Sequence, residues 1–307
     1  MRSLGVCSWC ACALLAACAS NASAQLVFGS TTTDGNNPCG MYYDVGSGQV
    51  TTLWKSAANK KVNGLAADAV NQKLYANDAA RLNVWNYGSV GTAPTAIAGM
   101  YRTSDPNTFT ATGVDGLAFA NGQLYGSTSY PSTVYKRGIY QIATVAVNSR
   151  CVMTQIWTDP TSSGTYSGAL TFGGLEFNPA DNLFYATLSA IDPNYANPPP
   201  RGLYSIDAFG AGAMTKVADF PAGRTKIDGL AIGGGKYWMT EQDPNAAQID
   251  IYPYDPVSGT YGTTIYVPLT DATQRATGAA WAPGAIPEPG TFGALVLLAL
   301  ASLRRRR

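Results

Sequence analysis

The residues with the clearest capacity for chemistry are three Asx side chains, each placed directly before a glycine. They are Asn63, Asp115 and Asp228, and each begins the pattern Asx-Gly-Leu. Amide and carboxylate oxygens are ligands that hard cations such as Ca²⁺ prefer, so three of them brought together would form a divalent metal site. Asx-Gly also favours a turn, because the Asx side chain bonds to nearby backbone and glycine tolerates positive φ. Both interpretations stay open at this level.

The chain contains no histidine. This excludes Ser-His-Asp and Cys-His catalysis, and it excludes zinc held by histidine. Any chemistry must therefore use carboxylates, amides, hydroxyls, Lys, Arg or a hard metal. No complete catalytic set stands out among these types, which favours a binding protein over an enzyme without deciding the question.

The Asx residues belong to a repeat that sets the expected fold. Its shared glycine occurs at positions 64, 116, 174, 229 and 278, at intervals of 52, 58, 55 and 49 residues. The first four glycines are each followed by an apolar-aromatic pair: Leu74-Tyr75, Leu124-Tyr125, Phe184-Tyr185 and Tyr237-Trp238. Two further β-rich runs follow each pair. A period of about 50 residues with four short strands per unit is typical of a β-propeller.

The two ends of the core complete one unit on this map. The repeat at Gly278 has an inner strand with no further strands after it, whereas Leu26-Val27-Phe28 matches the second-strand position. We therefore predict an all-β propeller of five four-stranded blades, with the last blade closed by one C-terminal and three N-terminal strands. Such closure removes a free sheet edge. Six blades with one degenerate unit is the alternative, although about 260 residues would then leave only about 43 per blade.

Inner strands line the centre of a propeller, so the residues before the repeat glycines are expected to form a ring. The ring would contain Asn63, Asp115, Gly173, Asp228 and Thr277. Because these positions are equivalent in the repeat, the three Asx side chains would converge on one axis.

The Asn-Gly-Leu and Asp-Gly-Leu segments resemble those of the gluconolactonase and regucalcin family of propellers. The resemblance implies that Asn63, Asp115 and Asp228 bind a divalent metal, here Ca²⁺. That family has six blades and a Glu-Gly-Pro ligand motif near its N-terminus, and this chain has no such motif. Glu176, three positions after Gly173, is the candidate to replace the missing glutamate ligand.

The C-terminus carries three features in a fixed order. Pro287-Glu288-Pro289 precedes an uncharged apolar run, Gly290 to Leu303, and four arginines follow, Arg304, Arg305, Arg306 and Arg307. As a short transmembrane helix the run would span about 21 Å, less than the roughly 30 Å of a bilayer core, with the arginines on the cytoplasmic side. The tail resembles the PEP-CTERM sorting signal of exported bacterial proteins, which implies recognition and cleavage by an exosortase. An uncut membrane anchor is the alternative.

The N-terminus is also that of an exported protein. Arg2 precedes an apolar stretch from Leu4 to Ala19, and Ala22-Ser23-Ala24 forms a signal-peptidase site. Cys18 lies in a lipobox-like segment and would be lipidated under the alternative interpretation. We favour cleavage after Ala24. The expected organisation is a signal peptide over 1–24, a β-propeller over 25–283 and a sorting signal over 284–307.

Charge and cysteine content limit the partners and the cross-links. The chain has 20 Lys and Arg against 19 Asp and Glu, which gives no electrostatic case for nucleic-acid binding. Only Cys39 and Cys151 remain after the signal peptide. The cell envelope permits a disulfide between them, but the repeat places them in blades that are not adjacent, so this bond is left open.

Together these features predict an exported protein whose precursor is anchored in the inner membrane. Signal peptidase and an exosortase would process it, and the product would lie at the cell surface or in the extracellular matrix. Its propeller is expected to bind polysaccharide or protein. The alternative is a metal-dependent hydrolase of lactonase or esterase type, in which the metal polarises a carbonyl and an Asp activates water.

Overall fold

The structure is a computed structural model of the chain. It describes residues 24–31, 38–55, 62–78, 81–102, 114–128, 138–160, 172–189, 199–242, 247–269 and 275–283. The expected signal peptide up to residue 23 and the expected sorting signal, with Pro287, Glu288, Pro289 and Arg304 to Arg307, lie outside these residues. Among the described residues, no helix is long and apolar enough to cross a membrane.

The described elements are β-strands in four hydrogen-bonded sheets. The largest sheet has the order β4-β5-β6-β7-β11-β10-β9-β8. Its strands are β4 (Gly64–Asp68), β5 (Lys73–Asp78), β6 (Arg81–Asn86), β7 (Thr95–Arg102), β8 (Val114–Ala120), β9 (Gln123–Thr128), β10 (Gly138–Ile142) and β11 (Arg150–Thr158). It consists of two antiparallel four-stranded units joined by a parallel pairing between β7 and β11, which the sequence pattern did not predict.

The next two sheets follow the predicted four-strand meander. One has the order β12-β13-β14-β15, with β12 (Phe172–Asn178), β13 (Leu183–Leu188), β14 (Gly202–Ile206) and β15 (Met214–Ala218). The other has the order β16-β17-β18-β19, with β16 (Gly229–Gly233), β17 (Lys236–Gln242), β18 (Gln248–Asp255) and β19 (Thr260–Tyr261). In this sheet β20 (Ile265–Pro268) also pairs with β18.

The remaining sheet contains both ends of the described core. Its order is β21-β1-β2-β3, with β21 (Arg275–Pro283), β1 (Ala24–Thr31), β2 (Pro38–Asp44) and β3 (Val50–Lys55). β1 and β21 pair antiparallel, from Ala24 opposite Pro283 to Thr31 opposite Arg275. One C-terminal strand and three N-terminal strands therefore form one sheet, in the order that the repeat indicated.

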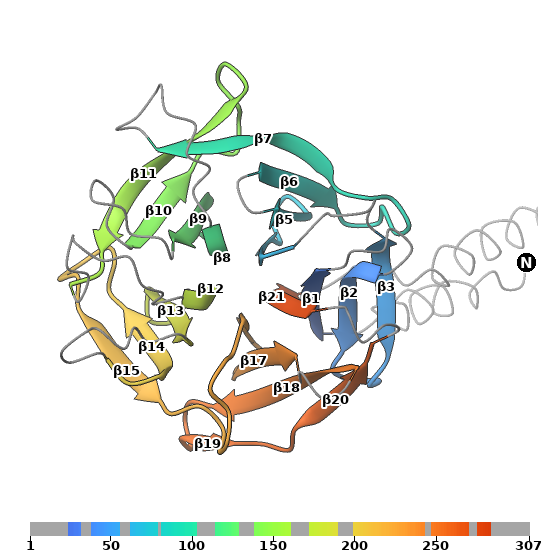
Figure 1. Cartoon of the computed structure of the whole chain (residues 1–307), viewed down its shortest axis with the longest axis vertical. Coiled ribbons are helices and arrows are strands. Elements are labelled where there is room, and N and C mark those ends of the chain that lie inside the picture. The colour runs from blue at the N-terminus through green and yellow to red at the C-terminus, as the bar shows by residue number, and fades with distance from the viewer. Residues whose placement is uncertain are drawn as a thin grey trace, which may run out of the picture.

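The sheets surround a common centre (Figure 1), where β8, β12 and β21 are innermost and β7, β11, β15 and β19 lie at the rim. The inner strands contact one another in a closed ring, β4 to β8, β8 to β12, β12 to β16, β16 to β21 and β21 back to β4. A closed ring of radially placed antiparallel sheets is the architecture of a β-propeller.

The repeat glycines are the points where these inner strands touch. A Cβ atom built on Gly174 would lie 2.4 Å from the backbone nitrogen of Leu230, and one on Gly116 would lie 2.6 Å from that of Leu175. A Cβ on Gly278 would lie 2.9 Å from the Cα of Gly64. Positive φ is not the reason for glycine here, because none of the repeat glycines is among the described glycines with positive φ. Close approach of the strands requires it.

At three of the repeat glycines, a polar side chain on the second strand of the same sheet accepts the glycine N–H. The N–H of Gly64 donates to Asn77 Oδ1 at 2.6 Å. The equivalent donations go from Gly116 to Ser127 Oγ at 3.0 Å and from Gly174 to Thr187 Oγ1 at 2.8 Å. At Gly116 and Gly174 the register shifts, so the ladder does not use these N–H groups and the side chains satisfy them.

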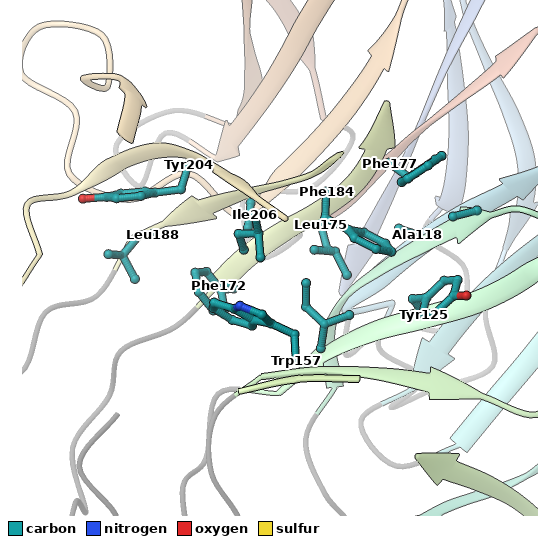
Figure 2. Close-up of a cluster of buried hydrophobic side chains, with 13 residues drawn as sticks. Ala118, Tyr125, Trp157, Phe172, Leu175, Phe177, Phe184, Leu188, Tyr204 and Ile206 are labelled. Carbon is teal, nitrogen blue, oxygen red and sulfur yellow. The ribbon is translucent and has the colours of Figure 1, made fainter. Parts of the chain in front are cut away.

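The aromatic pairs of the repeat pack between neighbouring sheets. Tyr185 of β13 lies against Tyr237 of β17, with ring centroids 4.8 Å apart, and Trp238 stacks on Trp281 of β21 at 5.8 Å. Figure 2 shows a cluster of this kind, in which Tyr125 and Trp157 meet Phe184 and other residues of the next sheet. Large aromatic surfaces buried between sheets stabilise the ring well beyond what any single sheet could.

The two cysteines of the core are not joined by a disulfide. Both are buried, but Cys39 belongs to the cluster beside β4 and β5, whereas Cys151 belongs to the cluster between β4 and β8. The disulfide left open by the sequence is therefore absent from this structure.

Candidate functional site

The three predicted Asx ligands lie at one end of the inner strands. Asn63, Asp115 and Asp228 directly precede repeat glycines, so the contacts between neighbouring strands fix their backbones around this end. All three side chains are half-buried. We call this part of the molecule the glycine end.

The other two positions of the predicted ring do not supply a free oxygen ligand from a side chain. Gly173 has no side chain, and a Cβ there would lie 2.5 Å from the carbonyl oxygen of Ile227. The hydroxyl of Thr277 donates to the backbone carbonyl of Val62 and so holds β21 against the start of β4. These two residues close the ring of strands.

Asp115 has an unsatisfied carboxylate oxygen. Its Oδ2 atom is buried and has no hydrogen-bond partner among the residues that the structure describes. Burial, together with the nearby charge of Asp228, raises the pKa of Asp115 to about 7. A carboxyl group in this state gains from any ligand that donates a hydrogen bond or carries positive charge.

Asp228 is held from two sides. Its backbone N–H donates to the carbonyl of Thr240 at 3.1 Å, and its Oδ2 lies 3.1 Å from the Nζ of Lys226. The ammonium of Lys226 is largely exposed, so this ion pair is screened by water and contributes little to stability. It nevertheless places a positive charge beside one predicted metal ligand.

Glu176 lies further along the inner strands than the Asx residues. Its buried carboxylate accepts hydrogen bonds from the backbone N–H groups of Phe177 and Trp281, and so bridges β12 and β21. Burial raises the pKa of Glu176 to about 8, against the opposing effect of these two hydrogen bonds. The group is therefore largely neutral at pH 7, which makes it a poor ligand for a cation until it loses its proton.

The residues fit a metal ion only in part. Among the described ranges, no group of three or more His, Cys, Asp or Glu side chains is arranged to hold one. The free oxygen of Asp115 suits a cation, and Asp228 and Asn63 could add oxygen donors. The ammonium of Lys226 beside Asp228 and the protonated state of Glu176 do not suit one.

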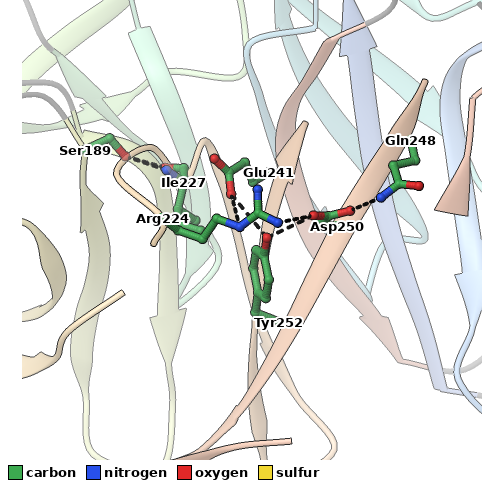
Figure 3. A network of polar contacts seen from close by, with 7 residues as sticks. All are labelled: Ser189, Arg224, Ile227, Glu241, Gln248, Asp250 and Tyr252. Carbon is green, nitrogen blue, oxygen red and sulfur yellow. Dashed lines mark hydrogen bonds and ion pairs between the residues drawn. The ribbon is translucent and has the colours of Figure 1, made fainter. Parts of the chain in front are cut away.

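A buried polar network lies on β17 and β18 (Figure 3), and the sequence did not predict it. Glu241 and Asp250 lie directly opposite each other on these strands. Two like charges in this position repel, so the pair needs a cation. Arg224 supplies it, with Nη2 2.9 Å from Asp250 Oδ2 and Nε 3.7 Å from Glu241 Oε2.

Further hydrogen bonds fix the two carboxylates of this network. The hydroxyl of Tyr252 lies 3.2 Å from Glu241 Oε2 and 3.1 Å from Asp250 Oδ2. Gln248 donates its Nε2 to Asp250 Oδ1 at 2.8 Å, and the guanidinium of Arg224 lies over the Tyr252 ring at 5.6 Å. The side chain of Asp250 is fully buried, whereas that of Arg224 is 29% exposed and reaches solvent.

Electrostatics couple this network to the Asx residues. Burial raises the pKa of Glu241 to about 7, and the charges of Asp250 and Asp228 raise it too. Arg224 and the hydroxyl of Tyr252 act in the opposite direction. Asp228 therefore influences both Asp115 and Glu241. We call Asn63, Asp115, Asp228, Glu241 and Arg224 the glycine-end site.

The sequence contained one signal for the missed part of the site. Asp250 is flanked by Ile249 and Ile251 in an otherwise apolar strand, and a charged residue in such a setting needs a buried partner. Arg224 could not be identified in the same way, because it lies in the connection before β16, outside any strand.

Comparison with known proteins identifies the fold. No family model and no curated protein matches the chain. A solved structure of the nidogen/laminin complex is 13% identical over 84% of this chain and 98% of that chain, with a TM-score of 0.50. The periplasmic gluconolactonase of Pseudomonas aeruginosa is 13% identical over 86% and 99%, with a TM-score of 0.44. At such identities the likeness concerns architecture, and the chain is a β-propeller.

The raised pKa of Asp115 predicts a dependence of stability on pH. Its folded pKa of about 7 exceeds its ordinary value, so the folded state binds more protons than the unfolded state between these values. Stability from this group is complete at low pH and is lost as pH rises through about 7. We expect Asp115→Asn to stabilise the protein more at about pH 8 than at about pH 5, measured by urea unfolding.

Asp255→Asn is the matched control. This exposed carboxylate accepts N–H groups from Val257 and Ser258, which lower its pKa, so its contribution to stability is lost as pH falls. Because this lowered pKa lies well below about pH 5, the carboxylate is ionised at both pH values, and the variant should differ from wild type by the same amount at each. If the stability of both variants relative to wild type responds equally to pH, the raised pKa of Asp115 in the folded state is contradicted.

Proposed function

We propose that this chain is an exported bacterial surface or matrix protein whose propeller binds polysaccharide or protein at the glycine-end site. The unsatisfied Oδ2 of Asp115 is the observation that carries this proposal. A buried polar atom without a partner is costly, so a ligand that donates a hydrogen bond to it gains affinity. Arg224, which pairs with Asp250 and Glu241 in this site and is 29% exposed, offers a complementary donor.

The export and sorting part of the proposal rests on the two terminal sequences. Pro287-Glu288-Pro289, the apolar run and the terminal arginines resemble a PEP-CTERM signal, and the N-terminal stretch has the order of a signal peptide. The pairing of Ala24 with Pro283 supports this proposal. The predicted signal-peptidase cut follows Ala24, the first residue of β1, and Pro287 comes four residues after Pro283, so both processing sites lie at the same end of these two paired strands.

We further propose that the propeller has five blades. The two units of the eight-stranded sheet would count as two blades, and each of the other sheets as one. Each of these units contributes one strand to the closed inner ring. The nidogen/laminin structure, which resembles this fold, is that of a protein–protein complex, and this supports a macromolecular ligand for the propeller.

The test is binding of the purified chain to the exopolysaccharide and surface proteins of the producing bacterium. Asp115→Asn should weaken binding about tenfold, the equivalent of roughly 1.4 kcal/mol, because the acceptor geometry and charge change together. Asp255→Asn, at the opposite end of the strands, should bind as wild type does. The proposal is wrong if the wild-type chain binds neither class of ligand, or if both variants bind equally.

A metal-dependent lactonase or esterase is the second candidate, because Asp115 and Asp228 are close enough to influence each other electrostatically. Asn63, Asp115 and Asp228 would hold Ca²⁺, which when bound supplies polarisation of a substrate carbonyl. Glu241, whose pKa is about 7, could accept a proton from water at neutral pH. Glu176 remains a proposed ligand only in its deprotonated form.

Calcium tests this second candidate directly. After treatment with a chelator, millimolar calcium should raise the melting temperature of the wild-type chain, because a ligand that binds only the folded state stabilises it. Asp115→Asn combined with Asp228→Asn should abolish the increase. If the Asx residues only shape the fold, calcium should leave the melting temperature unchanged. It should also fail to stimulate turnover of lactones and esters.

A further inference from the structure

The described turns between consecutive strands gather at the end of the strands opposite the glycine end. Each inner strand begins at its repeat glycine and ends at the turn before the second strand. Because successive strands of a sheet are antiparallel, the turn between its third and fourth strands lies at the same end. The turns comprise residues 45–49, 69–72, 87–94, 121–122, 143–149, 179–182, 207–213, 234–235 and 256–259. We call the surface that they form the turn face.

Both ends of the described core leave from the turn face. Ala24 and Pro283 face each other at the ends of β1 and β21. β21 is the innermost strand of its sheet and β1 is the second, as β4 and β5 are in theirs. The ends at Ala24 and Pro283 therefore lie where turn 69–72 joins β4 to β5. The chain beyond Pro283 therefore starts from this face, close to the centre of the propeller.

The distance from this point to the apolar C-terminal run is short. Six residues, 284–289, separate Pro283 from Gly290. Even fully extended, the seven steps from Pro283 to Gly290 span at most about 25 Å. A bilayer that holds the run from Gly290 to Leu303 must therefore lie within about 25 Å of the turn face.

The turn face is suited to contact with lipid. Its tips expose apolar side chains, with Val70 90% and Val257 95% exposed, and Val145, Val147 and Phe209 also exposed. Single exposed valines are ordinary on a soluble protein, but here they gather at the end from which the apolar run departs.

Charge is sparse within the turns themselves, whereas Lys73, Arg150 and Lys236 directly follow three of them. Turns 45–49, 69–72, 87–94, 121–122, 143–149 and 234–235 contain no Asp, Glu, Lys or Arg. Asp181, Asp207 and Asp255 occur in or beside other turns, and each accepts a backbone N–H from within three or four residues. The cost of bringing this face to a lipid headgroup region is correspondingly small.

We propose that the turn face rests on the surface of the bilayer that anchors the C-terminal run, with the exposed valines among the lipid headgroups. This inference rests on the proposed membrane-anchored precursor. It directs the glycine-end site away from the membrane, so the site can meet its ligand while the protein is still anchored. Membrane contact and ligand binding then use opposite ends of the same inner strands.

The test uses the full chain in vesicles of phosphatidylethanolamine and phosphatidylglycerol, with a fluorescent label on one introduced cysteine. Val70→Cys and Val257→Cys report on the turn face. Lys55→Cys is the matched control, because Lys55 is exposed at the glycine end of β3, in the sheet that contains β21. Cys39 and Cys151 are buried, and the four N-terminal cysteines are replaced by serine.

A quencher attached to the lipid headgroup should remove most of the emission of the labels at positions 70 and 257, and iodide in the water should remove little. The label at position 55 should respond in the reverse way. If the chain floats with the vesicles but all three labels respond equally, the docking inference is wrong and the anchored precursor stands. If the chain does not float with the vesicles, both the anchored precursor and the docking inference are wrong.

Discussion

Backbone contact between neighbouring inner strands, made at the repeat glycines, is the constraint on which the rest of this structure depends. Where a Cβ on Gly174 would lie 2.4 Å from the next backbone, no other residue fits without moving a strand. Where neighbouring strands come this close, the N–H groups of the glycines donate to polar side chains such as Asn77 and Thr187 instead of to the next strand of the sheet. This approach also brings the sheets close enough for their aromatic pairs to pack.

The glycine-end site is a consequence of the same geometry. Residues that precede the glycines are drawn together, so Asp115 and Asp228 share an environment that burial makes unfavourable for negative charge. Beside them, Glu241 and Asp250 face each other across two strands and depend on Arg224 for compensation. Perturbed carboxyl groups gathered in this way are typical of functional sites, and the remaining unsatisfied oxygen of Asp115 indicates where a ligand would bind.

The repeat predicted the strands and the closing sheet, whereas pairings and contacts outside the repeat escaped prediction. The recurring glycine and pairs such as Leu124-Tyr125 were sufficient to predict the propeller and the sheet shared by β1 and β21. The parallel contact of β7 with β11 has no counterpart in the repeat. Glycine itself was attributed to turns, although close approach of strands requires it. Arg224 reaches Asp250 from a connection without periodicity, so no pattern could identify it.

The contact at the repeat glycines can be tested by adding one methyl group. Gly174→Ala should lower the free energy of unfolding by about 1–3 kcal/mol, because the new Cβ meets backbone that cannot rotate away. Gly262→Ala is the control, since its Cβ would come no closer than 3.3 Å to any neighbour, and it should change stability by no more than about 0.5 kcal/mol. Urea unfolding of both variants measures this difference. Equal stability of the two variants would contradict a propeller closed by backbone contact at its glycines.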